Sequence, residues 1–242
     1  MIFNLKLIIL LYSFYFFLKL ILLFFMETKK EKNELKIIVV GNSGTGKTSF
    51  VRKWIKNTFD ENYKATIVSE FQYKIVEYKR KYYKIQLWDL AGQDLNSCIT
   101  KIFARNSHGC IVFTDITDEK SLNESIKWKN SVDDISKFID GDFLPSVLVQ
   151  NKIDCIDESE YNIFDDRIND FCNRGVYVHS FKTSAKLGIN VNECMMYLIE
   201  NIINRFDRFY KEGKKILYKE RKSIVLQKSK SNDENDEMGD CC

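Results

Sequence analysis

The sequence predicts an α/β fold, in which an open, mostly parallel six-stranded sheet has one antiparallel edge strand and helices on both faces. Three observations predict this fold class. Short, continuous apolar runs of strand length recur along the chain, as expected for parallel strands that are buried on both faces. Longer amphipathic stretches with polar caps lie between these runs and have the spacing of helices. Two further apolar runs are joined by a short basic turn, which is typical of an antiparallel hairpin.

Each element follows from its local pattern. The strands are predicted at residues 35–40, 70–78, 82–89, 109–115, 146–150 and 176–181, and the second and third of these form the hairpin. The helices are predicted at residues 47–57, 119–138, 163–174 and 190–207. In the second helix, polar residues precede apolar positions at Leu122, Ile126 and Val132. The chain shows no internal repeat.

Composition limits the possible classes of protein. With 242 residues, 45% hydrophobic and 29% charged, the chain has enough apolar side chains for one good-sized domain and is not disordered throughout. Its net charge of +3 does not call for a nucleic acid partner. The seven cysteines have no regular spacing, so they make a poor disulfide framework and fit a reducing cytosol. The two histidines, His108 and His179, are isolated, which argues against a metal cage built by the protein alone.

Four segments are predicted along the chain. Residues 1–26 form a hydrophobic segment, which is either a membrane anchor or a mis-assigned start, with translation beginning at Met26. Residues 27–34 are a polar lead-in and residues 35–207 are the main domain, which remains cytosolic in either case. Residues 208–242 are predicted to be a flexible tail, because bases and then acids dominate their composition.

A glycine-rich loop directly follows the first strand and precedes a helix. It consists of Gly41, Asn42, Ser43, Gly44, Thr45, Gly46, Lys47 and Thr48, followed by Ser49. Glycines let the backbone N–H groups of such a loop point inward at a phosphate, and the helix N-terminus behind them adds a positive partial charge. Lys47 would reach the outer phosphates and Thr48 would bind Mg2+. The spacing alone also arises in chance glycine turns, but the strand before it and the helix after it favour a phosphate-binding loop (P-loop).

Three later motifs also lie at strand ends, where open sheets bind ligands. Asp89 and Gly92 form a D-x-x-G element that can hold Mg2+ through water and contact a terminal phosphate. The second motif contains Asn151, Lys152 and Asp154, and the third is Ser184, Ala185 and Lys186. The Asp154 carboxylate can accept two hydrogen bonds from guanine, which adenine cannot supply, and backbone N–H groups of the third motif can bind guanine O6. Standing alone, the second motif could equally be a polar helix entry.

In this order, the four motifs resemble the small GTPases of the Ras superfamily, which have the P-loop NTPase fold, over about residues 35–207. Residues 88–93, the hairpin and the terminal cysteine pair are most similar to Rab proteins. Leu90, Trp128 and the extra length in residues 134–154 resemble the Rab branch linked to lysosome-related organelles.

The resemblance implies roles for further residues. Thr66 matches the switch I threonine that senses Mg2+ and the third phosphate, so the implied metal residues are Thr48, Thr66 and Asp89. Phe59 stands where the family stacks an aromatic ring on guanine. Gln93 matches the glutamine that orients the attacking water, and it is the implied catalytic residue together with Lys47 and Thr66. The aromatic triad read by Rab effectors corresponds to Phe71, Trp88 and Phe103.

The resemblance also implies a function: a GTP/GDP-cycling switch in vesicle trafficking that needs Mg2+ and hydrolyses GTP slowly without an activator. The implied partners are an exchange factor, a GTPase activator, a prenylation escort, a GDP dissociation inhibitor and effectors of the GTP state, and the chain would be a monomer. Prenyl groups on Cys241 and Cys242 would hold it on the cytosolic face of endosomes, lysosome-related organelles or Golgi vesicles. Val68, Ser69 and residues 94–96 depart from the Rab pattern, which keeps a non-cycling nucleotide-bound scaffold open. A P-loop kinase or ATPase is a further alternative.

Overall fold

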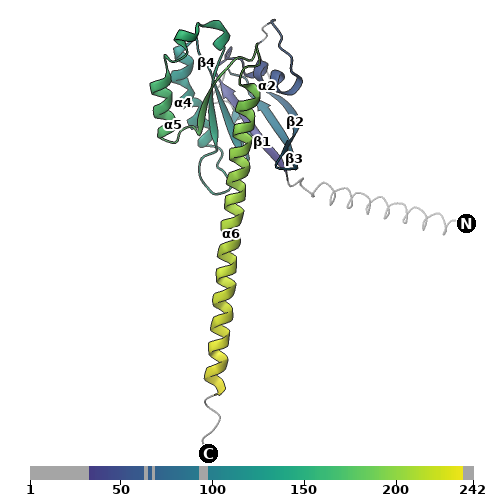
Figure 1. Cartoon of the computed structure of the whole chain (residues 1–242), viewed down its shortest axis with the longest axis vertical. Coiled ribbons are helices and arrows are strands. Elements are labelled where there is room, and N and C mark those ends of the chain that lie inside the picture. Colours follow the sequence, from purple (N-terminus) through teal and green to yellow (C-terminus); the bar gives the residue numbers. More distant parts are fainter. Residues whose placement is uncertain (1–32, 63–64, 67–68, 93–97, 237–242) are drawn as a thin grey trace, which may run out of the picture.

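A computed structural model describes residues 33–62, 65–66, 69–92 and 98–236 (Figure 1). Its centre is a six-stranded sheet with the strand order β2-β3-β1-β4-β5-β6. In chain order the strands are β1 (Glu34–Gly41), β2 (Glu70–Tyr78), β3 (Lys81–Asp89), β4 (Gly109–Asp115), β5 (Ser146–Asn151) and β6 (His179–Thr183). The edge strand β2 pairs antiparallel with β3, and every other pairing is parallel. The predicted fold class is confirmed.

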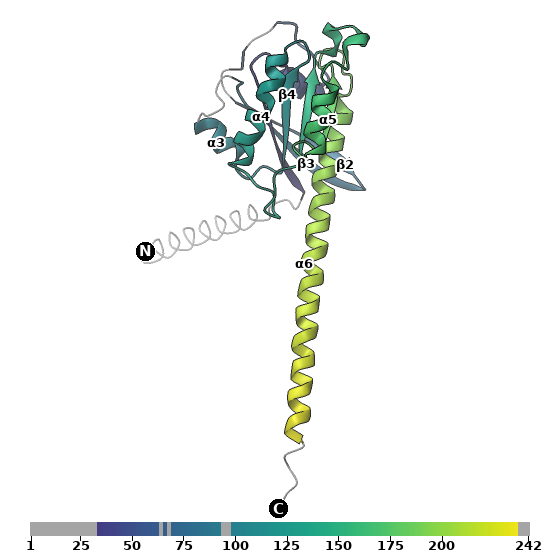
Figure 2. The ribbon, with the colours of Figure 1, turned by 90° about the vertical axis from the view of Figure 1, so that its left-hand side faces the viewer.

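Helices cover both faces of the sheet, with α2 and α6 on one face and α4 and α5 on the other (Figures 1 and 2). They are α2 (Lys47–Lys56), α3 (Cys98–Ala104), α4 (Glu119–Asp133), α5 (Asp165–Asn173) and α6 (Val191–Asp236), with short 3-10 turns at η1 (Ile153–Cys155) and η2 (Glu158–Glu160). The sheet is the core of the molecule, because every residue of β4 and β5 is buried. Strands that are buried along their whole length need cover on both faces, which the helices supply.

Several boundaries differ from the sequence prediction. The helix predicted at 119–138 ends at Asp133, and a loop follows in which Phe138 is buried and packs on Phe206 of α6. The last strand begins at His179 rather than at residue 176, although Tyr177 is buried as its apolar character suggested. Helix α3 was not predicted, because seven residues are too few to establish a helical period.

The C-terminal segment also differs from its prediction. Helix α6 continues without a break to Asp236, where composition predicted a flexible tail from residue 208 (Figure 2). The only proline of the chain is Pro145, and seven of the 29 residues at 208–236 are Lys, a good helix former. High charge was therefore a poor indicator of backbone conformation here.

The question of a membrane anchor falls on residues 1–26, which lie outside the described part of the chain. Among the described residues, none of the helices combines the length and the apolar character that crossing a bilayer requires.

Candidate functional site

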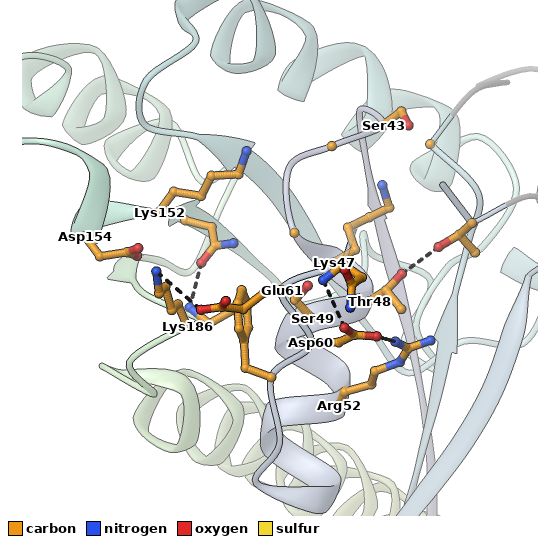
Figure 3. Close-up of a pocket in the computed structure, with 18 of the residues that line it drawn as sticks. Ser43, Lys47, Thr48, Ser49, Arg52, Asp60, Glu61, Lys152, Asp154 and Lys186 are labelled. Atoms are coloured by element: carbon orange, nitrogen blue, oxygen red, sulfur yellow. Dashed lines mark hydrogen bonds and ion pairs between the residues drawn. The ribbon is translucent and has the colours of Figure 1, made fainter. Parts of the chain in front are cut away.

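A cavity of about 670 Å³ opens at the carboxyl ends of the central strands (Figure 3). It brings together residues from the predicted P-loop, the D-x-x-G element and both predicted base-recognition motifs. The predicted site residues that line it are Ser43, Gly44, Gly46, Lys47, Thr48, Ser49, Phe59, Thr66, Gly92, Asn151, Lys152, Asp154, Ala185 and Lys186. The four strand-end motifs, which are far apart in sequence, therefore meet at one cavity as predicted, together with Phe59 and Thr66 from the segment after α2.

The P-loop takes a conformation that requires glycine at two positions. Gly41 has φ 137°, and a Cβ atom there would lie 2.4 Å from the carbonyl oxygen of Phe113. Gly46 has φ 91°, and a Cβ atom there would lie 2.2 Å from Asn151 Nδ2. No side chain among the described residues caps the N-terminus of α2, which begins at Lys47. Its first N–H groups are therefore available to an anion in the cavity.

Lys47 is the buried cation of the site. Its Nζ donates hydrogen bonds of 2.8 Å to the carbonyl oxygens of Gly41 and Asn42. Burial lowers the pKa of Lys47 to about 8, and the negative charge of Asp89 opposes this shift only in part. A phosphate group in the cavity would supply the counter-charge that the ammonium group needs.

Asp89, Thr48 and Thr66 form a compact cluster of oxygen atoms. The Thr48 hydroxyl donates to Asp89 Oδ2 at 2.5 Å and lies 2.7 Å from the Thr66 hydroxyl. The second carboxylate oxygen, Asp89 Oδ1, is buried and has no hydrogen-bond partner among the described residues. Burial raises the pKa of Asp89 to about 6. Hydroxyl and carboxylate oxygens are the ligands that Mg2+ prefers, so this cluster fits the ion that the sequence predicted here.

At the other end of the cavity, Asn151 joins three loops. Its amide nitrogen donates to the carbonyl oxygen of Thr45 at 2.9 Å, and its amide oxygen accepts from Thr183 Oγ1 and from the N–H of Ala185, both at 3.1 Å. Asp154 accepts a hydrogen bond from the hydroxyl of Ser184. Asn151 therefore holds the P-loop against the two motifs that were predicted to read the base.

Lys152 has a separate role from its neighbours. It adopts a left-handed backbone conformation, with φ 70°, and its Nζ lies 2.6 Å from Asp115 Oδ2 at the end of β4. Figure 3 shows Lys152, Asp154 and Lys186 together, apart from Lys47 and Thr48. The base end and the phosphate end of the cavity are thus distinct.

Gly92 lies directly against the P-loop. Its carbonyl oxygen accepts a hydrogen bond of 3.0 Å from the N–H of Ser43, and a Cβ atom at Gly92 would lie 2.4 Å from that nitrogen. The predicted catalytic Gln93 follows immediately but lies outside the described residues, as do the predicted lipidation sites Cys241 and Cys242.

The three residues of the predicted effector triad form one aromatic surface. The ring centroids of Phe71 and Trp88 are 5.0 Å apart, and so are those of Trp88 and Phe103. Phe71 is 46% exposed, whereas Trp88 and Phe103 are half-buried. Their contact agrees with the predicted grouping, and their role as an effector surface stays a prediction.

Sequence reasoning missed part of the cavity wall. The missed residues are Arg52, Asp60, Glu61, Asn62 and Cys155. Arg52 could have been found, because it lies four residues after Thr48 and so shares a face of α2 with it. The loop residues Asp60 to Asn62 carry no such signal, since only the path of the chain after α2 brings them to the cavity.

A P-loop, a hydroxyl and carboxylate cluster for Mg2+, and two loops at a base-binding end surround one cavity on a six-stranded sheet. Together they define a small GTPase domain. Residues 36–204 match the Ras family, and the chain belongs to that family.

Relatives identify the branch within it. The chain is 33% identical over 178 residues to Ras-related protein Rab-32 of Sus scrofa, covering 73% of this chain and 78% of the relative. It is 34% identical over 176 residues to Rab-32C of Dictyostelium discoideum, covering 73% and 76%. Ras-related protein Rab-7L1 of Rattus norvegicus is 30% identical over 170 residues, covering 70% and 82%.

The chain is thus a Rab-like small GTPase of vesicle trafficking and a GTP hydrolase, and its similarity extends to the branch linked to lysosome-related organelles. The resemblance given by its motifs is confirmed. Family membership carries with it guanine nucleotide binding, regulators and effectors of the general Rab kind, and association with endomembranes. Neither the scaffold nor the kinase or ATPase alternative finds support in these relatives.

Proposed function

We propose that this chain cycles between a GTP-bound and a GDP-bound form, each with Mg2+ in the cavity, and that the GTP-bound form recruits effectors through Phe71, Trp88 and Phe103. The observation that carries the proposal is the pairing of a desolvated cation, Lys47, with an unpartnered carboxylate oxygen, Asp89 Oδ1, at the phosphate end. Both charges are costly in a protein interior unless a ligand compensates them. Bound phosphate and Mg2+ would do so.

In this proposal each residue acts through its position. Lys47 and the N-terminus of α2 hold the phosphates, and Thr48, Thr66 and Asp89 hold Mg2+ directly or through water. When bound there, Mg2+ would neutralise part of the negative charge of the phosphates. Asp154 accepts the guanine hydrogen bonds, while the loop of Ser184, Ala185 and Lys186 contacts guanine O6.

Fast GTP hydrolysis requires an arginine supplied by another protein. Gln93 orients the attacking water, but residues 57–69, which contain switch I, include no arginine. An activator that supplies one would accelerate the reaction by ~10³ to 10⁵. Loss of the third phosphate would then release Thr66 and Gly92, so the segments around these two residues would report the nucleotide state.

The proposal for membrane attachment rests on the sequence of the C-terminal tail, residues 208–242. Prenyl groups on Cys241 and Cys242 provide two chains, which suffice for a stable anchor. Eight bases against two acids in residues 211–230 favour the anionic cytosolic face of endosomes, lysosome-related organelles or Golgi vesicles. While the chain is off the membrane, a prenylation escort and a GDP dissociation inhibitor would cover its prenyl groups. An exchange factor would replace GDP with GTP.

Nucleotide-resolved turnover tests the proposal. The full chain is loaded with radiolabelled GTP and Mg2+, and conversion to GDP is followed with and without cell extract as a source of activators. We expect slow conversion alone, faster conversion with extract, and little conversion in Gln93→Leu. The matched control Gln227→Leu makes the same substitution in the tail and should behave like the wild type. GTP that stays intact in the wild type under all conditions, or equal affinity for ATP, would contradict the proposal.

A further inference from the structure

The side chain of Asn42 in the P-loop is held at both of its polar atoms by helix α4. Its amide oxygen accepts a hydrogen bond of 2.8 Å from the indole N–H of Trp128. Its amide nitrogen donates to Glu124 Oε2 at 2.7 Å. Because Trp128 is only 3% exposed, loss of this contact would leave its indole N–H with little solvent to replace the partner.

The backbone of Asn42 belongs to the phosphate end of the cavity. Its carbonyl oxygen accepts from Lys47 Nζ at 2.8 Å and from Thr45 Oγ1 at 2.9 Å. The side-chain amide and the carbonyl group are both attached through the Cα atom of Asn42, so holding the amide at both ends restrains the backbone at this residue. A shift of the Asn42 backbone would therefore displace an acceptor of the Lys47 ammonium group.

The same helix also reaches the base end of the cavity. The Ser121 hydroxyl, in the first turn of α4, accepts from the N–H of Asp115 at 2.9 Å. The Asp115 carboxylate pairs with Lys152 Nζ at 2.6 Å. Helix α4 therefore contacts both halves of the nucleotide site without lining the cavity itself.

We propose that Trp128 and Glu124 are positioning residues: they fix Asn42, and through it the P-loop, and so set the rate at which nucleotide leaves. This inference rests on the proposed nucleotide-binding function and adds a control point outside the cavity. Trp128 acts on the phosphates only through Asn42, so the two residues should behave as a unit. Nucleotide release is the step that such a clamp slows, because a P-loop held in its binding geometry keeps its contacts to the phosphates.

Release of methylanthraniloyl-GDP from the full chain, chased with excess GDP in the presence of Mg2+, measures this effect. Trp128→Phe removes the indole N–H and should accelerate release about three- to tenfold, the range expected for one hydrogen bond. Asn42→Ala should accelerate it similarly, and the double variant should release no faster than the faster single variant. Glu124→Ala should also accelerate release, whereas Glu124→Gln keeps an acceptor oxygen and should largely restore the wild-type rate.

The matched control is Trp54→Phe. Trp54 is also buried, at 4% exposure, but its indole N–H has no hydrogen-bond partner among the described residues. The control should therefore release nucleotide at the wild-type rate. A purely structural role for Trp128 predicts instead that the accelerations of Asn42→Ala and Trp128→Phe multiply.

Three results would overturn the inference alone: multiplied effects, a Trp128→Phe rate within twofold of wild type, or an equal acceleration by Trp54→Phe. A wild-type chain that does not bind the labelled GDP would instead overturn the proposed function and the inference with it.

Discussion

The buried carboxylate of Asp89 should destabilise the nucleotide-free protein. The pKa of Asp89 rises from its ordinary value of 3.8 to about 6, because burial disfavours the charged form more than the hydrogen bond from Thr48 and the charge of Lys47 favour it. This difference corresponds to about 3 kcal/mol at pH 7. Asp89→Asn keeps an oxygen that can accept from Thr48 but carries no charge. We therefore expect it to stabilise the nucleotide-free chain by about that amount.

The sign of this effect defines its pH window. The folded state binds the Asp89 proton more tightly than the unfolded state does, so the proton-linked stability is fully present below pH 3.8 and is lost as pH rises through about 6. The difference in unfolding free energy between Asp89→Asn and wild type should therefore be near zero at pH 3.5 and should reach its full value by pH 7.

Urea unfolding of the chain, freed of nucleotide with a chelator, measures this difference at a series of pH values. Asp140→Asn serves as a control of opposite sign, because hydrogen bonds from Arg205 lower the pKa of Asp140. With GDP and Mg2+ present the order should reverse, since the wild type gains a cation contact that Asp89→Asn loses. A difference that stays flat from pH 3.5 to 7, or an Asp89→Asn chain that is less stable than wild type at pH 7 without ligand, would refute the reasoning.

Three further predictions concern the same fold. Gly46→Ala should lower affinity for labelled GDP at least about tenfold in an equilibrium titration, because φ 91° and a contact of 2.2 Å with Asn151 Nδ2 both oppose a methyl group; unchanged affinity would contradict the strained loop. Asn151→Ala should lower the unfolding free energy in urea by about 2–5 kcal/mol, since it leaves buried partners of three hydrogen bonds unsatisfied; a loss of nucleotide affinity at unchanged stability would argue against its role in joining the loops. Phe71→Ala should abolish capture of GTP-dependent effectors from cell extract yet leave release of labelled GDP unchanged, because Phe71 does not line the cavity; altered release would show that the two surfaces are coupled.

The sequence predicted those parts of the site whose residues are consecutive and follow a buried strand. Gly41 to Thr48, Asn151 to Asp154 and Ser184 to Lys186 are each set by a local motif, and the sheet brings their strand ends together. The alternation of short apolar runs with longer amphipathic stretches was likewise enough to predict the six strands.

Contacts between distant residues could not be predicted in this way. Trp128 and Asn42 are 86 positions apart, and nothing in either segment indicates that an indole would meet an amide. Helix α4 ends at Asp133, and Phe138 in the following loop packs on Phe206, a tertiary contact that the local helical pattern does not indicate. The long helix beyond Asp207 could not be predicted from composition, because charged residues are common both in flexible tails and in exposed helices.

The length of α6 gives the protein a defined reach. From Asp207 to Asp236 the helix adds 29 residues, which span about 44 Å at 1.5 Å per residue. A random coil of the same number of residues would have a mean end-to-end distance of only about 30 Å and would sample all directions. A lipid anchor at the far end of such a rod would keep the nucleotide-binding domain well clear of the bilayer surface. Its effectors would then meet it in the surrounding cytosol, at a height that the number of helical turns determines.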